Sequence, residues 1–476
     1  MTKVDSADMR LKTSLDDAKA GRVTRHESVE SLMHHLDGIA CALGDVVKPT
    51  RPRVKPSEKP DLPFIGMEHV EPHSMRLLGT VPASTMKSSA VHFQPGDVLY
   101  GRLRPYLNKV YRPDFEGLCS AEFIVFPKTE NLDSRYLQYF LNSAAFVSFA
   151  THLNAGDRPR VDFDQLAPYP FPVRSLDQQK RIVAEIEKQF SRLDEAVANL
   201  KRVKANLKRY KAAVFKAAVE GRLVETEAEL ARREGRSFET GEQLLQRILE
   251  TRRSQWQGKG KYKEPVAPDA TGLPELPEGW VWASVEQLGH VGTGATPLRS
   301  RRDYYDGGEI PWITSGALNE EFVSTADECI TELAVEETNA KVFPEHTLLV
   351  AMYGEGKTRG KVSELLIEAA TNQACAAIVM QGLSKRVRSF TKLFFLKNYE
   401  DIRRLSSGGV QPNLNLSHIK ATAIPFPPLA EQHRIVAEVD RHLSIIHETK
   451  TQVDANLQRA ESLRHAILYK SLSSGI

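Results

Sequence analysis

Cysteine is scarce in this sequence of 476 residues, and its four copies lie far apart, at Cys41, Cys119, Cys329 and Cys375. No two of them have the Cys-x-x-Cys spacing that is typical of thiolate zinc sites. Their wide separation also does not indicate a disulfide scaffold. We therefore expect reduced thiols, as in cytoplasmic proteins.

Long apolar runs are missing as well. No stretch of about 18 apolar residues occurs, so no segment is expected to span a membrane. The first residues, Met1–Ser6, include an aspartate and no apolar core, which is unlike a secretory signal. The expected location is the cytoplasm, and no membrane partner is expected.

The sequence lacks both a large excess of charge and the motifs of common catalysts. Its formal net charge is +3, so DNA binding would have to come from local basic surfaces. No Asn-Pro-Pro-Tyr-like methyltransferase motif, no His-Glu-x-x-His and no paired metal-ligand spacing is present. The isolated Gly292–Gly294 lacks the rest of a cofactor loop. We expect no catalytic residue, metal or cofactor on this chain.

What the sequence does contain is an internal repeat. Pro170–Pro172 precedes Gln179–Ile186, and Pro425–Pro427 precedes Gln432–Val439. Both copies read Pro-Phe-Pro and then Gln-x-Arg-Ile-Val-Ala-Glu, and they stand 253 residues apart, as Gln179 and Gln432 show. This period is far too long for a solenoid, so it indicates a duplicated module.

Each copy opens a long stretch without glycine or proline, at 176–219 and at 429–474. Apolar residues recur there every seven positions, which places them on one seam of a helix. About 45 helical residues would span about 65 Å, whereas the mean helix has about 11–12 residues. We therefore expect two helices that pack on each other rather than two ordinary core helices. Because the chain must return through a domain between them, an antiparallel pair is favoured. The predicted seam comprises Ile186, Leu193, Leu200, Leu207, Val214, Val439, Ile446, Val453, Ala460 and Ile467.

The segments before the two helices also match, though weakly. They mix short strand-like runs with glycine, proline, asparagine and aspartate turns, so each half is expected to be an α/β globule followed by a long helix. Between the halves, 221–256 has a helical pattern and 257–279 has the composition of an extended connector. The aligned pairs are Leu43–Val46 with Leu288–Val291, Pro63–Ile65 with Pro311–Ile313, Phe93–Leu99 with Phe343–Leu349, and Asn154–Gly156 with Ser407–Gly409.

Four motifs accompany the repeat: Pro427–Gln432 followed by Arg434–Val436, Leu276–Trp280, Thr293–Pro297 and Gly308–Ile313. With them, the sequence resembles the specificity subunits of type I restriction-modification systems over about residues 40–476. The first 40 residues lack the short start with a tryptophan that is usual in this family.

The resemblance implies a non-catalytic subunit that reads a bipartite, asymmetric target in double-stranded DNA, one half with each target-recognition domain. It implies two methyltransferase (modification) subunits as partners, which two motor-nuclease (restriction) subunits can join. S-adenosylmethionine, ATP and magnesium are expected on those partners. The expected fold class is α+β, with two globular domains alternating with two antiparallel coiled-coil helices in a pseudo-twofold repeat. Its parts are an N-terminal helical extension (1–40), target-recognition domain 1 (41–174), a central long helix (175–220), a helical segment and linker (221–279), target-recognition domain 2 (280–428) and a C-terminal long helix (429–476).

Basic loops that follow apolar strands are the candidate DNA contacts. Arginine and lysine bind phosphates, arginine pairs with guanine, and asparagine or glutamine pairs with adenine. Matching loops lie at 101–109 and 354–361, and further candidates lie at 156–160, 299–305 and 411–415, where a cap, turn or solvated-loop role is equally open. The candidates are Arg102, Arg104, Asn108, Lys109, Arg158, Arg160, Arg299, Arg301, Arg302, Lys357, Arg359, Lys361, Gln411, Asn413 and Asn415.

Two alternatives stay open from the residues. Ala351–Thr358 loosely resembles a phosphate-binding loop, which would make the chain a nucleotide hydrolase. The strict pattern, however, has glycine where Ala351 stands, and Gly360 would interrupt the helix that must follow. The second alternative is a coiled-coil scaffold for protein partners. Its DNA affinity would then depend neither on DNA sequence nor on the loop arginines.

Overall fold

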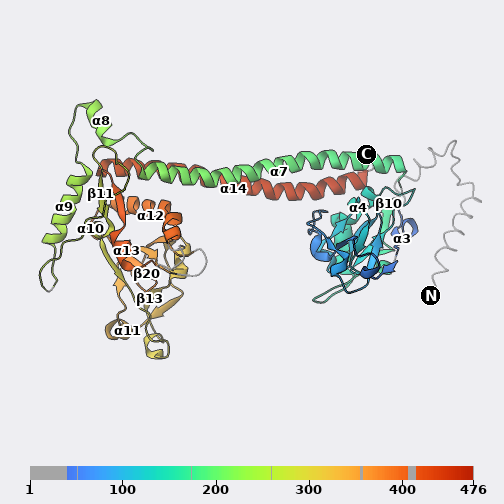
Figure 1. The fold of residues 1–476 in the computed structure, drawn as a ribbon, viewed down its shortest axis with the longest axis horizontal. Coiled ribbons are helices and arrows are strands. Elements are labelled where there is room, and N and C mark those ends of the chain that lie inside the picture. Colours follow the sequence, from blue (N-terminus) through green and yellow to red (C-terminus); the bar gives the residue numbers. More distant parts are fainter. Residues whose placement is uncertain are drawn as a thin grey trace, which may run out of the picture. The chain divides into compact units, whose positions relative to one another are not determined.

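The structure is a computed structural model, and it describes residues 40–50, 52–172, 174–258, 260–353, 358–405 and 414–474. The predicted N-terminal helical extension therefore lies outside the described residues, apart from its last position. The chain divides into two compact units, one of Met1–Lys201 with Asp454–Ile476 and the other of Arg202–Val453. Each unit thus holds one α/β domain and one part of each long helix (Figure 1).

The first unit is built on two small sheets. In the larger sheet one pair, β3 with β8, is parallel and the other pairs are antiparallel. Its order is β2 (Arg53–Val54), β5 (Ala90–Phe93), β8 (Gly117–Cys119), β3 (Pro63–Ile65) and β4 (Val81–Pro82). The smaller sheet has the order β7 (Val110–Tyr111), β6 (Val98–Gly101) and β9 (Phe123–Phe126).

Short helices and a terminal strand pair complete this domain. Helix α4 begins after Asp133, whose carboxylate accepts hydrogen bonds from the backbone of Arg135 and Tyr136. Aromatic side chains such as Tyr100 and Phe146 fill the core, with their rings packed edge to face. The remaining elements are β1 (Ala40–Ala42), which pairs with β10 (Pro170–Pro172), and the helices α3 (Leu43–Val46), α4 (Ser134–Asn142), α5 (Ala144–His152) and α6 (Phe163–Leu166).

The second unit is also built on two sheets, which together hold more strands than the two sheets described for the first unit. One sheet has the order β12 (His290–Thr293), β20 (Cys375–Val379), β17 (Leu348–Ala351), β18 (Val362–Leu365) and β14 (Phe322–Val323). The other has the order β15 (Glu328–Ile330), β13 (Ile310–Ile313), β19 (Ala369–Thr371) and β16 (Val342–Phe343). Strand β11 (Val281–Ser284) pairs with β21 (Ala423–Phe426), and the helices are α10 (Val285–Leu288), α11 (Glu332–Glu337), α12 (Lys385–Leu405) and α13 (Leu416–Ala421).

Strand pairing shows how the two halves correspond. The parallel pair β3–β8 of the first domain has its counterpart in the parallel pair β13–β19 of the second. This agrees with the alignment of Pro63–Ile65 with Pro311–Ile313. The alignment of Leu43 with Leu288, however, is wrong. Leu43 opens α3 and its N–H donates to Tyr169, just as Val285 opens α10 and its N–H donates to Thr422.

The two long helices are continuous, α7 from Leu176 to Val219 and α14 from Leu429 to Ser474. In the first unit the beginning of α7 packs against the end of α14, where the Arg464 guanidinium lies over the Phe190 ring. In the second unit the end of α7 packs against the beginning of α14, and the Tyr210 hydroxyl lies 2.8 Å from Nδ1 of His442. The pairing is therefore antiparallel within each unit.

The predicted seam lies on the packed side of these helices. Seven of its residues are buried, and three in the middle of α7 are partly buried. The buried ones are Ile186, Val214, Val439, Ile446, Val453, Ala460 and Ile467, and the partly buried ones are Leu193, Leu200 and Leu207.

A helical segment and a connector follow α7. Thr226 and Thr240 cap α8 (Glu227–Glu234) and α9 (Gly241–Ser254), each within a capping box. The described residues from Gln255 to Trp280 form neither helix nor strand. Helices and sheets together confirm the predicted α+β class. No helix in the described part of the chain is long and apolar enough to cross a membrane.

Candidate nucleic-acid interface

Two loops predicted separately come together in the first domain. The β6–β7 loop meets the segment before α6, because Leu103 bridges to Arg160 and the N–H of Arg104 donates to Pro159 O at 2.7 Å. The N–H of Val161 also donates to Arg102 O at 3.0 Å. We call the resulting patch the first loop surface, defined by Arg102, Arg104, Arg158 and Arg160.

Carboxylates hold two of these four arginines. Arg160 forms a two-pronged contact with Glu122, at 3.1 Å from Nε and 2.6 Å from Nη2. Arg102 contacts Asp162 through Nη2. Arg158, by contrast, is exposed, and the described residues offer it neither a hydrogen bond nor an ion pair. It is thus the arginine of this surface that is most available to an outside anion.

Two candidates from the same loop are not part of this surface. Asn108 adopts a left-handed conformation with φ 46°, its side chain is only 4% exposed, and its amide donates to Asn142 O at 3.3 Å. Lys109 donates to Met67 O at 2.5 Å, and partial burial lowers its pKa. Both side chains hold the loop on the domain, so we leave them out of the proposed contacts.

The matching loop of the second domain is described only at its ends. Lys357, Gln411 and Asn413 lie outside the described residues. Lys361 donates to Asn319 Oδ1 at 2.7 Å, and Arg359 is half-buried with no acceptor for its Nε. The Asn415 side chain accepts the His418 N–H at the start of α13, so this candidate is a helix cap.

The structure contradicts the nucleotide-hydrolase alternative. A phosphate-binding loop needs a helix after it, whose first N–H groups face the phosphates. Here Thr358 is buried, Gly360 takes a positive φ of 82°, and strand β18 begins at Val362. The described residues also contain no group of three or more potential metal ligands.

The basic-aromatic cluster of the second domain is an ordered stack. The Arg299 guanidinium lies 4.8 Å from the Tyr305 ring centre and 5.1 Å from that of Trp312, with Glu328 at 2.7 Å. Such stacking fixes the plane of the guanidinium. This arginine is therefore held by both rings and a carboxylate.

Arg301 and Arg302 differ although they are neighbours. Arg301 stacks on Tyr304 at 4.3 Å and contacts Asp303 at 2.5 Å, and this hydrogen bond raises its pKa. Arg302 is exposed, and within the described ranges no partner contacts its side chain. Arg302 is therefore available to an outside anion in the second domain, as Arg158 is in the first. We call Arg299, Arg301 and Arg302 the second loop surface.

The partner carboxylates are the part of the site that sequence reasoning missed. Glu122 stands 38 residues from Arg160, and Asp162 stands 60 residues from Arg102. No local spacing signals pairs so far apart. Because such carboxylates neutralise most of the arginines on the two loop surfaces, few of the guanidinium groups there lack an anionic partner among the described residues.

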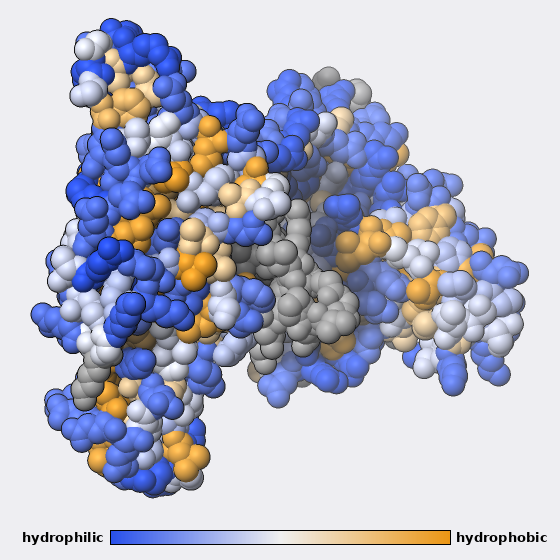
Figure 2. Space-filling model, turned by 60° about the vertical axis from the view of Figure 1, so that its left-hand side comes forward, coloured by the Kyte–Doolittle hydropathy of each residue, from blue (hydrophilic) through white to orange (hydrophobic). Residues whose placement is uncertain are grey.

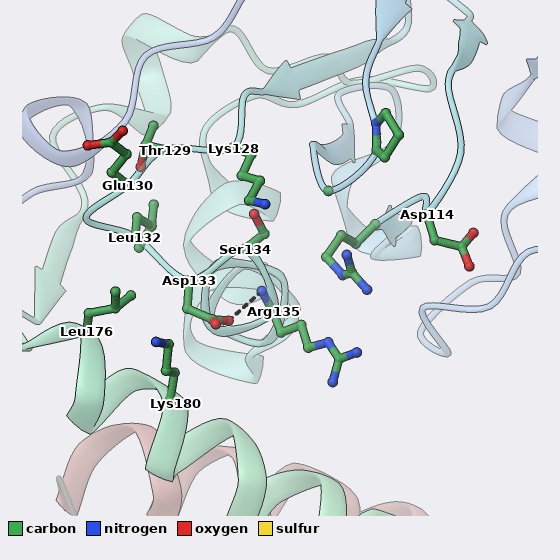
Figure 3. A pocket seen from close by; sticks show the side chains of 13 residues that line it. Asp114, Lys128, Thr129, Glu130, Leu132, Asp133, Ser134, Arg135, Leu176 and Lys180 are labelled. Atoms are coloured by element: carbon green, nitrogen blue, oxygen red, sulfur yellow. Dashed lines mark hydrogen bonds between the residues drawn. The ribbon is translucent and has the colours of Figure 1, made fainter.

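A cavity of about 470 Å³ is lined by residues before β6, after β9 and at the starts of α4 and α7, and Figure 3 shows their side chains. The first loop surface follows the other end of β6. The lining of the cavity mixes cations such as Lys128 and Lys180 with anions such as Glu130 and Asp133. Asp133 is already engaged in capping α4. The cavity carries charges of both signs and none of the loop arginines lines it. We therefore do not count it as part of the candidate interface.

The face of the molecule shown in Figure 2 is mainly hydrophilic, with scattered apolar residues. Leu298 and Phe322 are among the large apolar side chains that are exposed in the second unit. Scattered residues of this kind are ordinary for a protein surface. Polar and charged contacts therefore dominate what this face can offer to a partner.

Known proteins resemble this chain in sequence and in fold. Residues 277–457 match the family model described as the type I restriction modification DNA specificity domain. Among solved structures, a chain from a study titled as complex assembly of the type I R-M system is 19% identical, with a TM-score of 0.64. It covers 92% of this chain and 98% of its own. The HsdS subunit from Thermoanaerobacter tengcongensis has a TM-score of 0.55 at 18% identity, covering 92% of this chain and 97% of its own. Residues 277–457 therefore match the DNA specificity domain of type I restriction-modification systems, and the chain as a whole is similar to proteins named as specificity subunits of such systems.

Curated relatives agree with this placement. The MjaIX specificity subunit of Methanocaldococcus jannaschii is 28% identical over 190 residues, which is 38% of this chain and 42% of that protein. The HindI specificity subunit of Haemophilus influenzae is 23% identical over 400 residues, 75% of this chain and 83% of that protein. The matches span only 42% and 32% of the first two relatives, MjaIX and the EcoDI subunit of Escherichia coli.

Proposed function

We propose that this chain reads a split, asymmetric sequence in double-stranded DNA and directs methylation by partner subunits to it. The observation that carries the proposal is the duplication. Two domains that share a parallel strand pair each present an arginine surface, and the residues of the two surfaces differ. Unlike surfaces would read unlike half-sites, so the target would not be a palindrome. The chain itself would catalyse nothing.

Arg158 and Arg302 are the side chains that we propose for direct contact with DNA. Each is exposed and available to an anion, and a guanidinium can bind a phosphate or pair with guanine. The arginines that already pair with carboxylates would present guanidinium groups of fixed orientation to the DNA. These are Arg102, Arg160, Arg299 and Arg301. Arg104 and Arg359 belong to the same loops, and we propose that they also contact DNA. We propose the same for Lys357 and Lys361.

The proposed assembly holds two methyltransferase subunits, which two motor-nuclease subunits can join, all in the cytoplasm. S-adenosylmethionine, ATP and magnesium would belong to those partners. The helices α7 and α14 would then fix how many base pairs separate the half-sites. A DNA turn is about 34–36 Å, and each helical residue rises by 1.5 Å.

Base-resolution mapping of adenine methylation tests the proposal. DNA would be compared from cells that carry the methyltransferase subunit with this chain and from cells that carry it without this chain. Methylation at one split motif only in the presence of the chain is the expected result. If the pattern is the same in both, with the methyltransferase active, the reader role is wrong.

A matched pair of variants refines this test. Arg158→Ala should weaken methylation by relaxing or abolishing one half-site, and Arg302→Ala should affect the other. Arg253→Ala on α9, which removes an exposed arginine that pairs with Glu264 and belongs to neither loop surface, is the control that should leave the motif intact. A scaffold without a DNA role would respond to none of the three.

A further inference from the structure

One buried carboxylate joins three distant segments of the second unit. Glu431, in the first turn of α14, is fully buried. Its Oε1 accepts the indole N–H of Trp280 at 3.0 Å, and its Oε2 accepts the backbone N–H of Glu227 at 2.9 Å. Two donors thus meet the two oxygens of one carboxylate. We call Glu431, Trp280 and Glu227 the carboxylate clasp.

A second carboxylate continues the clasp. Glu227 is 3% exposed and forms ion pairs with Arg434 at 2.6 Å and with Arg236 at 2.7 Å. Arg434 lies one turn after Glu431 on α14. Helix α8 is therefore tied to the beginning of α14 by a charge pair as well as by the Glu431 hydrogen bond.

Trp280 carries the connection into the second domain. Its ring packs edge to face on Phe390 of α12, with the ring centres 6.1 Å apart. Strand β11 begins at the next residue, Val281. Gly221, just past the end of α7, has φ 68° and lies against Pro277 and Trp280, so closely that a Cβ there would approach Pro277 to 2.5 Å. The ends of both long helices and the entry to the domain therefore meet around this indole.

The first half of the chain is built differently at the corresponding place. Gln178 stands where Glu431 stands in the second copy, and its Oε1 accepts the N–H of Ser175 at the start of α7. The chain has no tryptophan before Trp256. The neighbouring Gln179 accepts the N–H of Asp133 at 2.8 Å, so a neutral amide ties α7 to α4. The charged clasp therefore belongs to the second copy.

We propose that Glu431 is a positioning residue for DNA recognition: its carboxylate fixes the second domain on α14 and thereby the spacing at which the second half-site is read. This inference rests on the proposed function. The geometry gives the physical reason. The contacts from Glu431 through Trp280 to Phe390 run from helix to domain without passing through the loop surface, so they can set orientation without choosing bases.

Methylation mapping of Glu431 variants in the complete complex tests this. Glu431→Ala should keep both half-site sequences but accept spacers one base pair longer or shorter. Its methylation at the native spacer should fall about tenfold, as expected for losing a hydrogen bond to a charged group. Glu431→Gln should have a smaller effect, since its single amide oxygen can accept from only one of the two donors. Gln178→Ala is the matched control and should leave the spacing unchanged.

Trp280→Phe keeps the test decisive if the alanine variant folds poorly. Phenylalanine retains the ring packing and loses only the N–H donor, so it should relax the spacer in the same direction. If both variants methylate only the native spacer at the wild-type level, Glu431 does not position the domain. The same conclusion follows if both lose all methylation while their thermal unfolding matches that of the wild type. If the wild-type chain directs no split-motif methylation, the proposed function fails first and this inference falls with it.

Discussion

The two domains of this chain share part of their strand pairing, including a parallel pair, but they differ in how their charges are arranged. In the first domain the loop arginines are met by Glu122 and Asp162 from distant segments. In the second, Arg299 and Arg301 are stacked on tyrosine and tryptophan rings as well as paired. Part of the sheet pairing recurs in both domains, whereas the surfaces that would read DNA differ.

This difference shows that buried residues determine the fold and that exposed loop residues determine what the surface can bind. Pairing of β3 with β8 and of β13 with β19 depends on buried apolar residues, which restrict change. Loop side chains that face solvent can change without disturbing that core. A duplicated scaffold can therefore present two unlike reading surfaces.

The largest expected effect is a loss of stability in one unit when a core residue of a long helix is truncated. Matching helix positions allow the two units to be compared. Ile182 of α7 and Ile435 of α14 are both fully buried. Truncation of either to alanine should cost about 2–5 kcal/mol, because it leaves a cavity. Hydrogen exchange should show that Ile182→Ala weakens protection mainly in the first unit and Ile435→Ala mainly in the second. Equal loss of protection in both units would show that the two units unfold together.

The loop arginines should give the next largest effect. Arg158→Ala and Arg302→Ala should each weaken binding to the specific DNA by about 1–3 kcal/mol if the side chain contacts a base. If it contacts a phosphate, the loss should be similar for every sequence and the salt dependence should become shallower. Titration of the complete complex with specific and scrambled duplexes at two salt concentrations separates these cases. Unchanged affinity for both variants would remove these two arginines from the interface.

Removal of a helix cap should destabilise the two domains to different extents, and this difference should be smaller than the effects above. Asp133 accepts two backbone N–H groups at the start of α4, whereas Ser384 accepts one, from Arg386, at the start of α12. Asp133→Ala should cost about 1 kcal/mol and Ser384→Ala no more than that. Exchange rates in the first turns of α4 and α12 measure the effect. A larger loss for the serine variant would contradict the reasoning.

A dependence on pH should be the smallest effect and should be confined to the second unit. Burial opposes ionisation of Glu227, but hydrogen bonds from Arg434 and Arg236 outweigh it, so the pKa of Glu227 lies below its usual value of 4.5. A lowered pKa contributes stability above the unfolded value, and that stability is lost as the pH falls through the folded value. The urea midpoint of Glu227→Gln should therefore lie below that of the wild type near pH 7, and the two should converge as the pH falls through the lowered pKa of Glu227. A gap that persists at acid pH would show that charge on Glu227 is not its cause.

The sequence predicted the long helices well because their signal is local. A seven-residue apolar spacing without glycine or proline needs no knowledge of distant residues, and Ile186 and Val439 are buried as that pattern requires. The fold class also followed from the repeat, and the resemblance to specificity subunits followed from the repeat together with four short motifs. The alignment at Leu43 failed because identical Leu-Gly letters mark the beginning of one short helix and the end of another.

The candidate site was harder to predict from sequence. Asn108 and Lys109 look like members of a basic loop, but a left-handed backbone and nearby carbonyl acceptors direct them into the domain. The carboxylates that hold Arg160 and Arg102 stand far along the chain. Glu431 was noted only as part of a motif, since its partners Trp280 and Glu227 are brought to it by the tertiary fold.

The first unit is closed by the last segment of the chain, Asp454–Ile476. During synthesis the core of the first domain can therefore be completed only after the whole second unit has been made, because Leu468 and Leu472 belong to that core and follow the second unit along the chain. Until then the apolar side of α7 next to that domain stays uncovered. A stop codon before Leu468 would accordingly damage the domain that was translated first.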